Sequence, residues 1–195
     1  MENRESAASR WYDSISSSGE TNPDKGYKFV ERLIDARTLN INLHPEIAFN
    51  RIQNIGGEKG WYAWNLLWQL RGIIDLLLGG VGMRRGRSHK DKLIVGGTID
   101  FWRIEKTIPN NFLRLSAEMK LPGRAWLEFE VIGKENSSTI KQTAIFEPIG
   151  FFGKIYWYAL YPLHQLIFAG MLQAIAKKAL ALNKKAGTIS EKKYK

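Results

Sequence analysis

Three polar side chains fall on otherwise apolar faces of predicted elements, where a polar group can carry chemistry. Asp100 and Gln142 lie on the inward faces of two predicted strands, and His164 lies on a helical stripe with Tyr161 and Phe168. Such groups are costly to bury unless they are paired, and in ligand sites a few of them fix the orientation of the ligand. A buried carboxylate or an imidazole can also act as a general base. Asp100 and His164 are therefore the candidate catalytic residues.

Both candidate catalytic residues could instead have a purely structural role. Asp100 could pair with a structural arginine such as Arg103 or Arg124. His164 could be a core histidine that bonds a backbone carbonyl or a tyrosine. The geometry of the interior decides between these alternatives.

Metal and nucleophile chemistry are not expected. His44 and His89 lie on different predicted elements from His164, so the three histidines do not suggest a metal site. The sequence has no cysteine, which excludes a disulfide scaffold, a thiolate metal site and a cysteine nucleophile. No Gly-x-Ser-x-Gly motif is present.

A basic loop is the second candidate for chemistry. The segment 83–92 carries three arginines, two lysines and one histidine around Gly86. Guanidinium groups bind carboxylates and phosphates through two hydrogen bonds, and glycine permits close backbone approach. We predict that Arg84, Arg85 and Arg87 contact an anionic head group at the mouth of a cavity. The alternative is a solvated loop, and the spacing does not match a nucleotide-binding loop.

The chain is rich in aromatic residues, which make up 12% of it and include seven tryptophans. Large rings favour a lined cavity or an interface, although the same rings could simply fill a core. The predicted ligand-binding residues combine inward-facing positions with the basic loop: Trp64, Trp68, Arg84, Arg85, Arg87, Trp102, Met119, Phe129, Gln142, Phe146, Tyr158, Tyr161 and Phe168.

Alternation and helical spacing predict the elements that position these residues. Residues 37–43 alternate strictly, with Leu39, Ile41 and Leu43 on one side, which predicts a half-buried strand. A helix then begins at His44-Pro45 and ends at Gly56-Gly57, and a second helix is predicted over 61–78. Four strands follow, over 98–107, 113–121, 125–131 and 139–147. Their short polar links predict antiparallel pairing.

A long helix is predicted from Phe151 to Leu182, in spite of Pro162. It is apolar on almost every side as far as residue 175, which is typical of a helix buried on two sides or placed in a membrane. The window Ile155–Ala176 has no formal charge and is long enough to span a bilayer. Because the strands need a cover, we predict a core helix, and a membrane span is the alternative.

The length of 195 residues suits one domain. Residues 1–28 are polar and predict a loose arm, 29–182 a single domain, and 183–195 a Lys-rich tail. The arm has no apolar run of the kind that a secretory signal needs, so the cytoplasm is the expected compartment.

The net charge of +10 is concentrated in two places. The segment 84–92 and the tail 177–195 account for all of it, so the rest of the chain is neutral. A neutral body with two basic patches does not favour nucleic-acid binding. The tail is expected to be solubilising, with weak contact to a membrane surface as the alternative.

Several motifs carry a resemblance to a known family. They are GVGMRRGR at 80–87, DFWRI at 100–104, LPGRAWLEF at 121–129, QTAIF at 142–146, YWY at 156–158 and PLH at 162–164. Together these resemble a bacterial domain of unknown function, DUF2867-like, of the START-like or Bet v 1-like (SRPBCC) superfamily. The resemblance covers about residues 30–181.

The resemblance implies an α+β helix-grip fold. In that fold a curved antiparallel sheet wraps around a long C-terminal helix, and two short helices follow the first strand. It also implies an internal cavity, but no established chemistry. Members often follow an NAD(P)-binding Rossmann domain. The sequence before residue 30 shows no strand, Gly-rich turn and helix, so no nucleotide cofactor is expected.

These observations lead to one main hypothesis and three alternatives. The main hypothesis is a module that binds a hydrophobic or amphipathic small molecule, lipid-like or polyketide-like, between the sheet and the last helix. The first alternative is a cyclase, dehydratase or isomerase that uses Asp100 or His164 as its base. The second is an accessory partner of a separate Rossmann-type oxidoreductase. The third is a homodimer formed along the second stripe of the last helix.

Overall fold

The computed structural model describes residues 31–82, 86–89 and 92–193, with side chains described as far as residue 181. The strands are β1 (Leu33–Ile41), β2 (Thr98–Ile99), β3 (Trp102–Ile108), β4 (Phe112–Ala117), β5 (Gly123–Lys134) and β6 (Ser137–Pro148). The helices are α2 (Pro45–Gln53), a 3₁₀ turn η1 (Gly57–Lys59), α3 (Asn65–Leu77) and α4 (Gly150–Lys193). The six strands form one antiparallel sheet in the order β1-β6-β5-β4-β3-β2.

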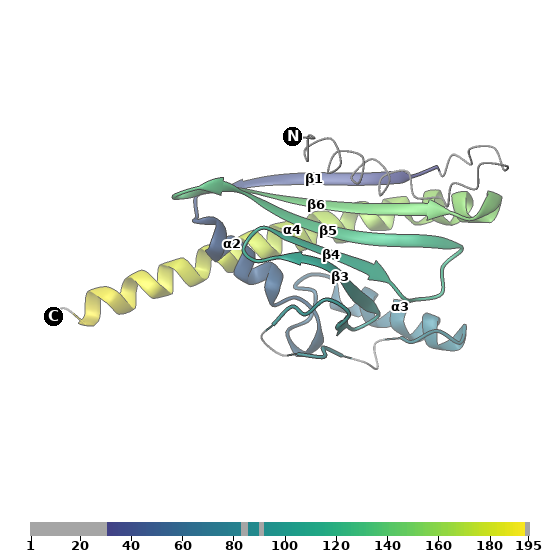
Figure 1. Cartoon of the computed structure of the whole chain (residues 1–195), viewed down its shortest axis with the longest axis horizontal. Coiled ribbons are helices and arrows are strands. Elements are labelled where there is room, and N and C mark those ends of the chain that lie inside the picture. The colour runs from purple at the N-terminus through teal and green to yellow at the C-terminus, as the bar shows by residue number, and fades with distance from the viewer. Residues whose placement is uncertain (1–30, 83–85, 90–91, 194–195) are drawn as a thin grey trace, which may run out of the picture. The chain divides into compact units, whose positions relative to one another are not determined.

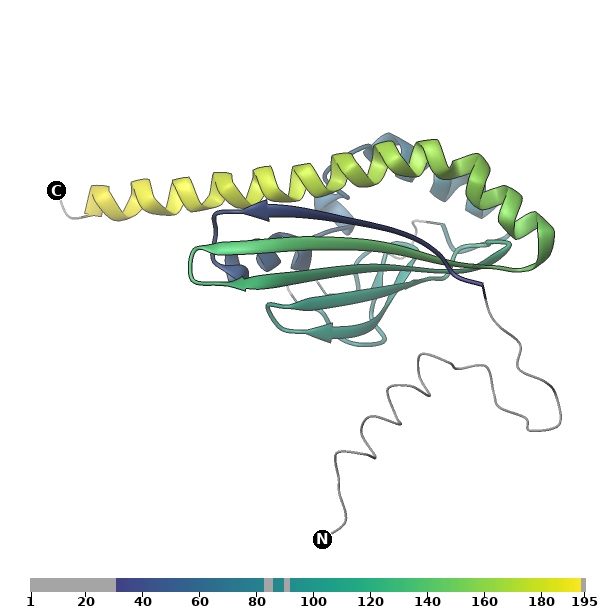
Figure 2. The same cartoon turned by 90° about the horizontal axis from the view of Figure 1, so that it is seen from above.

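The long helix α4 runs along the sheet, with α2 and α3 beside it (Figure 1 and Figure 2). The element order and this arrangement confirm the predicted α+β helix-grip fold. The alternation predicted for the first strand is also confirmed, because Leu39 and Ile41 are less exposed than Thr38 and Asn40. That strand begins earlier than predicted, at Leu33, which pairs with Phe146.

One predicted strand is broken. Residues 98–107 were expected to form a single strand, but the chain turns at Asp100, whose φ is +55°. Strict alternation fails at this turn, and Ile99 and Phe101 are buried as well as Trp102. The inward position predicted for Asp100 therefore arises from a turn and not from a strand face.

The second helix is shorter than predicted. It begins at Asn65 and not at Trp61, because Tyr62 and Trp64 have positive φ values of 67° and 56°. The side-chain oxygen of Asn65 accepts a hydrogen bond from the backbone N–H of Trp61 at 3.0 Å. Residues 61–64 thus form a turn that directs the Trp61 ring into the interior, where it is fully buried.

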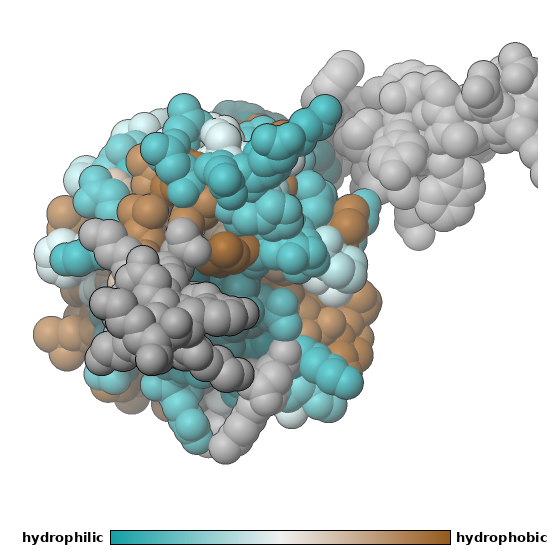
Figure 3. Space-filling model, turned by 90° about the vertical axis from the view of Figure 1, so that its left-hand side faces the viewer, coloured by the Kyte–Doolittle hydropathy of each residue, from teal (hydrophilic) through white to brown (hydrophobic). Residues whose placement is uncertain are grey.

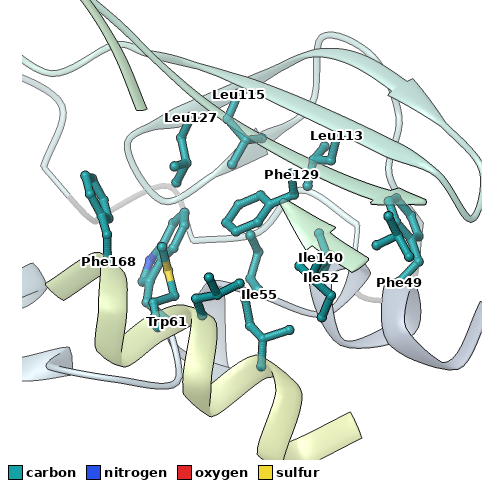
Figure 4. Packing of buried hydrophobic residues seen from close by; sticks show 14 of the residues in the cluster. Phe49, Ile52, Ile55, Trp61, Leu113, Leu115, Leu127, Phe129, Ile140 and Phe168 are labelled. Atoms are coloured by element: carbon teal, nitrogen blue, oxygen red, sulfur yellow. The ribbon is translucent and has the colours of Figure 1, made fainter. Parts of the chain in front are cut away.

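The interior is filled at the end where α2 lies. Phe49 and Ile52 from α2 pack with Phe129 and Ile140 from the sheet and with Ile175 from α4, and each is at most 1% exposed. Figure 4 shows most of these side chains converging between the sheet and the helices. This end of the domain has a close-packed core of the kind that gives a small domain its stability.

The helix α4 buries one face on the sheet, through Trp157, Ile167, Phe168, Met171 and Ile175. Within the described residues it is the one helix long and apolar enough to cross a membrane, over Gly150–Ala181. A core helix passes the same test; α4 packs against β1, β6 and α2, and 33% of the apolar window is buried.

Candidate ligand cavity

The interior is hollow at the other end, where α3 lies. A cavity of about 200 Å³ lies between α3, the sheet and the first half of α4. Its wall is largely apolar and aromatic. It includes Trp68 from α3, Trp102 from β3, Met119 from the loop after β4, Phe146 from β6, and Trp157 and Phe168 from α4.

Several residues of the predicted ligand set line this cavity. They are Trp68, Trp102, Met119, Phe146 and Phe168. Their positions follow from a few contacts. Trp68 stacks on Trp61 with ring centroids 5.1 Å apart, and Phe146 stacks on Trp157 at 5.6 Å. The aromatic groups therefore form both a packed cluster and a cavity wall.

Other predicted residues lie elsewhere. Trp64 lies against Gly170 of α4, where a side chain would meet the Trp64 ring. Phe129 belongs to the filled core, and Gln142 is buried outside the cavity lining. Tyr158 and Tyr161 are exposed by 63% and 41%. None of these side chains is part of the cavity wall.

The basic loop is described only in part. Arg84 and Arg85 lie outside the described residues. Arg87 donates from Nη1 to the carbonyl of Ile55 at 2.9 Å and from Nε to that of His89 at 2.6 Å. These bonds attach its own loop to the segment after α2. The Arg87 side chain does not line the cavity.

Asp100 is fixed by hydrogen bonds away from the cavity. Its Oδ2 atom accepts from the indole N–H of Trp61 at 2.8 Å and from the backbone N–H of Gly57 at 3.2 Å. The partners are thus not the arginines suggested by the sequence. Arg103 instead pairs with Glu118 at 2.6 Å. The carboxylate connects the turn after β2 to the segment between α2 and α3.

Sequence reasoning missed Arg71 of α3, which is the one charged side chain among the described residues of the cavity wall. Its Nη2 donates to the carbonyl of Lys120 at 3.0 Å, and its Nη1 lies 4.0 Å from Oδ1 of Asp75. Its guanidinium also interacts with the phenol of Tyr156 of α4, which lines the cavity too. Burial raises the pKa of Tyr156 above its ordinary value, and Arg71 partly opposes this, so the phenol is neutral.

A signal for these residues was present in the sequence. Arg71 and Asp75 form an i, i+4 pair inside an apolar run. A charged pair within an apolar helix also indicates a buried polar site. Tyr156 lies on the helix two residues before Tyr158, and only the direction in which the helix faces the sheet distinguishes the two.

His164 does line the cavity, and its imidazole is neutral. Burial lowers the pKa of His164 below its ordinary value, Asp35 opposes this effect and Arg37 adds to it. The ring lies between Trp157 and Phe168, with centroid distances of 5.4 Å and 5.3 Å. Among the described residues, its Nδ1 atom has no hydrogen-bond partner, and neither has the Nε1 atom of Trp68 or Trp102.

The lowered pKa of His164 gives a prediction about pH. The unfolded chain takes up a proton near pH 6.5, where the folded protein does not. The contribution of His164 to the free energy of unfolding is therefore fully present above about pH 6.5 and is lost as the pH falls through that value, by at most about 1.4 kcal/mol per pH unit.

Urea unfolding between pH 7.5 and 5 measures this loss of unfolding free energy. His164→Phe should flatten the profile, whereas His89→Gln, at an exposed position, should not. Equal slopes in the wild type and His164→Phe would contradict the prediction.

Over the described part of the chain, His, Asp and Glu side chains form no group of three or more that could hold a metal ion. Among the described residues of the cavity wall, the polar groups are those of Arg71, Tyr156, His164 and the tryptophan indoles. These groups can donate hydrogen bonds to a ligand, and Arg71 also supplies a positive charge.

Comparison with known proteins bears on the fold and the family. A norcoclaurine synthase point mutant of Thalictrum flavum in complex with a transition-state analogue is 13% identical, with a TM-score of 0.50 over 80% of this chain and 99% of that one. The dimeric Aha1 of Colwellia psychrerythraea is 13% identical, with a TM-score of 0.45 over 74% and 96% of the two chains. Ara h 8.0201 is 9% identical, with a TM-score of 0.44 over 77% and 99%. At such identities the likeness concerns the fold alone.

A search of curated proteins finds no significant match to the sequence. One family does match, over residues 31–171, and it is described as a protein of unknown function, DUF2867. The match covers most of the chain, including every element from β1 to the first half of α4. The chain therefore belongs to the DUF2867 family.

Proposed function

We propose that this protein binds a small amphipathic molecule, with an apolar ring or short chain inside the cavity and an acidic group against Arg71. The observation that supports this most directly is a wall whose described residues are mostly apolar and include one charged side chain, Arg71. Apolar pockets with a few placed polar groups are the usual form of small-molecule sites. A guanidinium group is well suited to a carboxylate or phosphate, because it offers two parallel donors.

The volume limits the size of the ligand. An apolar cavity of about 150 Å³ accommodates a benzene molecule. At about 200 Å³ the cavity suits one ring with a short chain, or the end of an acyl chain. It lies below the range of about 300–1,000 Å³ that is usual for drug-sized ligands. A long-chain lipid or a multi-ring polyketide would therefore extend beyond the cavity.

Arg71 is held in place for such a role. Its bond to the Lys120 carbonyl and its contact with Tyr156 fix the guanidinium between α3, α4 and the loop after β4. The Oδ1 atom of Asp75 lies 4.0 Å from Nη1 of Arg71, and the two carboxylate oxygens also accept two backbone N–H groups. The carboxylate therefore neutralises the positive charge of Arg71 only in part. An anionic ligand would complete this neutralisation in a site of low water content.

Two variants and a matched probe pair test the proposal. Aryl-alkanoates and the corresponding alcohols, for example 3-phenylpropionate and 3-phenylpropanol, are titrated by calorimetry. Ala144→Leu should weaken both probes about tenfold or more, because the added side chain fills the space beside Phe146. Ala36→Leu, at an exposed position on β1, is the control and should leave binding unchanged. Solvent extraction of the purified protein and mass spectrometry would identify a natural ligand.

A second variant tests whether the ligand needs a negative charge. Arg71→Gln should weaken the carboxylate probe about tenfold or more and leave the alcohol within about twofold, since a charged hydrogen bond contributes about 1.5–3 kcal/mol. An equal loss for both probes would show that Arg71 acts only through the shape of the wall. Unchanged binding in Ala144→Leu would show that the ligand does not occupy this cavity.

A second candidate function is acid–base catalysis in the same cavity, and it is favoured by the neutral imidazole of His164, whose Nδ1 atom has no partner among the described residues. The base would then be His164, since the Asp100 carboxylate is engaged elsewhere. The test is deuterium exchange next to the carbonyl of a bound aryl ketone in D₂O, followed by NMR. Exchange that is unaffected by His164→Gln would remove this candidate.

A further inference from the structure

A large apolar surface surrounds the cavity. On α3 the exposed side chains recur at helical spacing, and the start of α4 continues the same character. We call this surface the collar; it consists of Leu66, Leu70, Ile73, Ile74, Leu77 and Leu78 from α3 and the residue after it, and of Ile149, Phe151, Phe152, Ile155 and Leu163 from α4 and the residue before it. Exposure reaches 82% at Leu77 and 79% at Phe152. An exposed apolar surface of this extent is typical of an interaction site.

The collar includes the rim of the cavity. Leu70, Ile74 and Leu163 are each exposed, by 51%, 43% and 37%, and each also lines the cavity. These three side chains therefore mark where the cavity reaches the surface, between α3 and α4. Figure 1 and Figure 2 both place α3 and the start of α4 at the same end of the sheet. Figure 3 views the opposite end, where hydrophilic side chains cover more of the described surface than hydrophobic ones.

The charges beside the collar are positive. Leu121, in the cavity wall, is flanked by the exposed residues Lys120 and Arg124. The nearby acidic groups are neutralised, Glu118 by Arg103 at 2.6 Å and Glu147 by Arg32 at 2.7 Å. Asp75 is the single acidic residue of α3 and is fully buried. An apolar surface with basic residues at its edge complements a membrane with anionic lipids.

We propose that the collar docks on the surface of an anionic lipid bilayer and brings the cavity mouth to the membrane. The charge favours an anionic lipid surface as the partner, because the exposed Lys120 and Arg124 flank the apolar wall and the acidic groups nearby are already paired. The helix α4 lies on the membrane and does not span it, since its other face, with Met171 and Ile175, is buried in the core. An apolar ligand could then pass between bilayer and cavity without crossing water.

Vesicle flotation with the full chain tests the proposal. Vesicles of phosphatidylcholine with 30% phosphatidylglycerol should carry the protein upward, and pure phosphatidylcholine should carry much less. The double substitution Ile73→Glu with Leu77→Glu should reduce the bound fraction about tenfold or more, because binding scales with the apolar area inserted. Ile108→Glu with Ile132→Glu, at exposed positions on β3 and β5, is the matched control and should bind as the wild type does.

Two further measurements, of the dependence on charge and of the oligomeric state, distinguish membrane docking from dimerisation through the collar. Lys120→Glu with Arg124→Glu, or a rise in salt to 0.5 M, should reduce binding to the anionic vesicles several-fold. Unchanged flotation of the Ile73/Leu77 variant would overturn the proposal. So would a wild type that stays off vesicles but dimerises through the collar, as light scattering of the same variants would show. Docking is independent of the proposed ligand binding, because the Ile73/Leu77 variant should still bind 3-phenylpropionate in solution.

Discussion

Replacing Asp75 with alanine should lower the free energy of unfolding by about 3–5 kcal/mol. The carboxylate is fully buried, and each of its oxygens accepts a different backbone N–H group, Oδ2 from Gly82 at 2.8 Å and Oδ1 from Lys120 at 2.6 Å. Each buried donor left without a partner costs about 1–3 kcal/mol. Thermal and urea unfolding of the purified variant measure the loss.

The same change should disturb the cavity wall. Asp75 lies 4.0 Å from Arg71 and fixes the loop whose Lys120 carbonyl receives the Arg71 guanidinium. A Cβ on Gly80 would collide with the carboxylate, so the chain is closely packed around it. We therefore expect Asp75→Ala to weaken the carboxylate probe as well as the fold.

Asp75→Asn distinguishes this arrangement from a simple effect of volume. An amide keeps one oxygen but turns its NH₂ group toward the second N–H donor, so one bond is lost and two donors oppose each other. Asparagine should therefore restore little of the stability. Lys120→Ala is the control, since it removes an exposed side chain and keeps the backbone N–H. Near-wild-type stability of Asp75→Asn would contradict the two-sided role of the carboxylate.

The fold could be predicted because it depends on patterns that extend over many residues. The alternation in β5 and β6 and the short polar turns between strands specify the antiparallel sheet, and the apolar stripe of α4 specifies its cover. The structure departs from the predicted elements at turns, where the backbone conformation of a few residues sets the direction of the chain. Positive φ at Tyr62, Trp64 and Asp100 bends the chain, and no periodicity reports such bends.

The site was predicted in part for a related reason. Trp68, Trp102 and Phe168 were expected to point inward, and they do line the cavity. Which inward side chains line a space and which fill it depends on three-dimensional packing, and Phe129 lies in the filled core. Arg71 reaches the wall only because α3 and the loop after β4 meet. A separate Rossmann-type oxidoreductase as partner stays a prediction from the family resemblance.

Replacing Asp100 with alanine should also cost about 3–5 kcal/mol of unfolding free energy. The variant leaves the buried Trp61 indole N–H and the Gly57 N–H without their acceptor. It also places alanine at a φ of +55°, where a residue without a polar side chain costs about 1–2 kcal/mol. The measurement is urea unfolding, with the double variant of Asp100→Ala and Trp61→Phe to isolate the coupling of the pair.

Asp100→Asn should behave unlike Asp75→Asn, because both hydrogen bonds at Asp100 end on the same oxygen, Oδ2. An asparagine oxygen can occupy that position, and asparagine tolerates positive φ, so the expected loss is below about 1 kcal/mol. The same substitution to asparagine should therefore lower the stability strongly at Asp75 and only slightly at Asp100. A general base would lose its function in Asp100→Asn while the fold persisted, whereas a structural acceptor would keep both. A stable Asp100→Asn protein that no longer supports the deuterium exchange would identify Asp100 as a general base, and unchanged exchange would leave it as the link between Trp61 and the turn after β2.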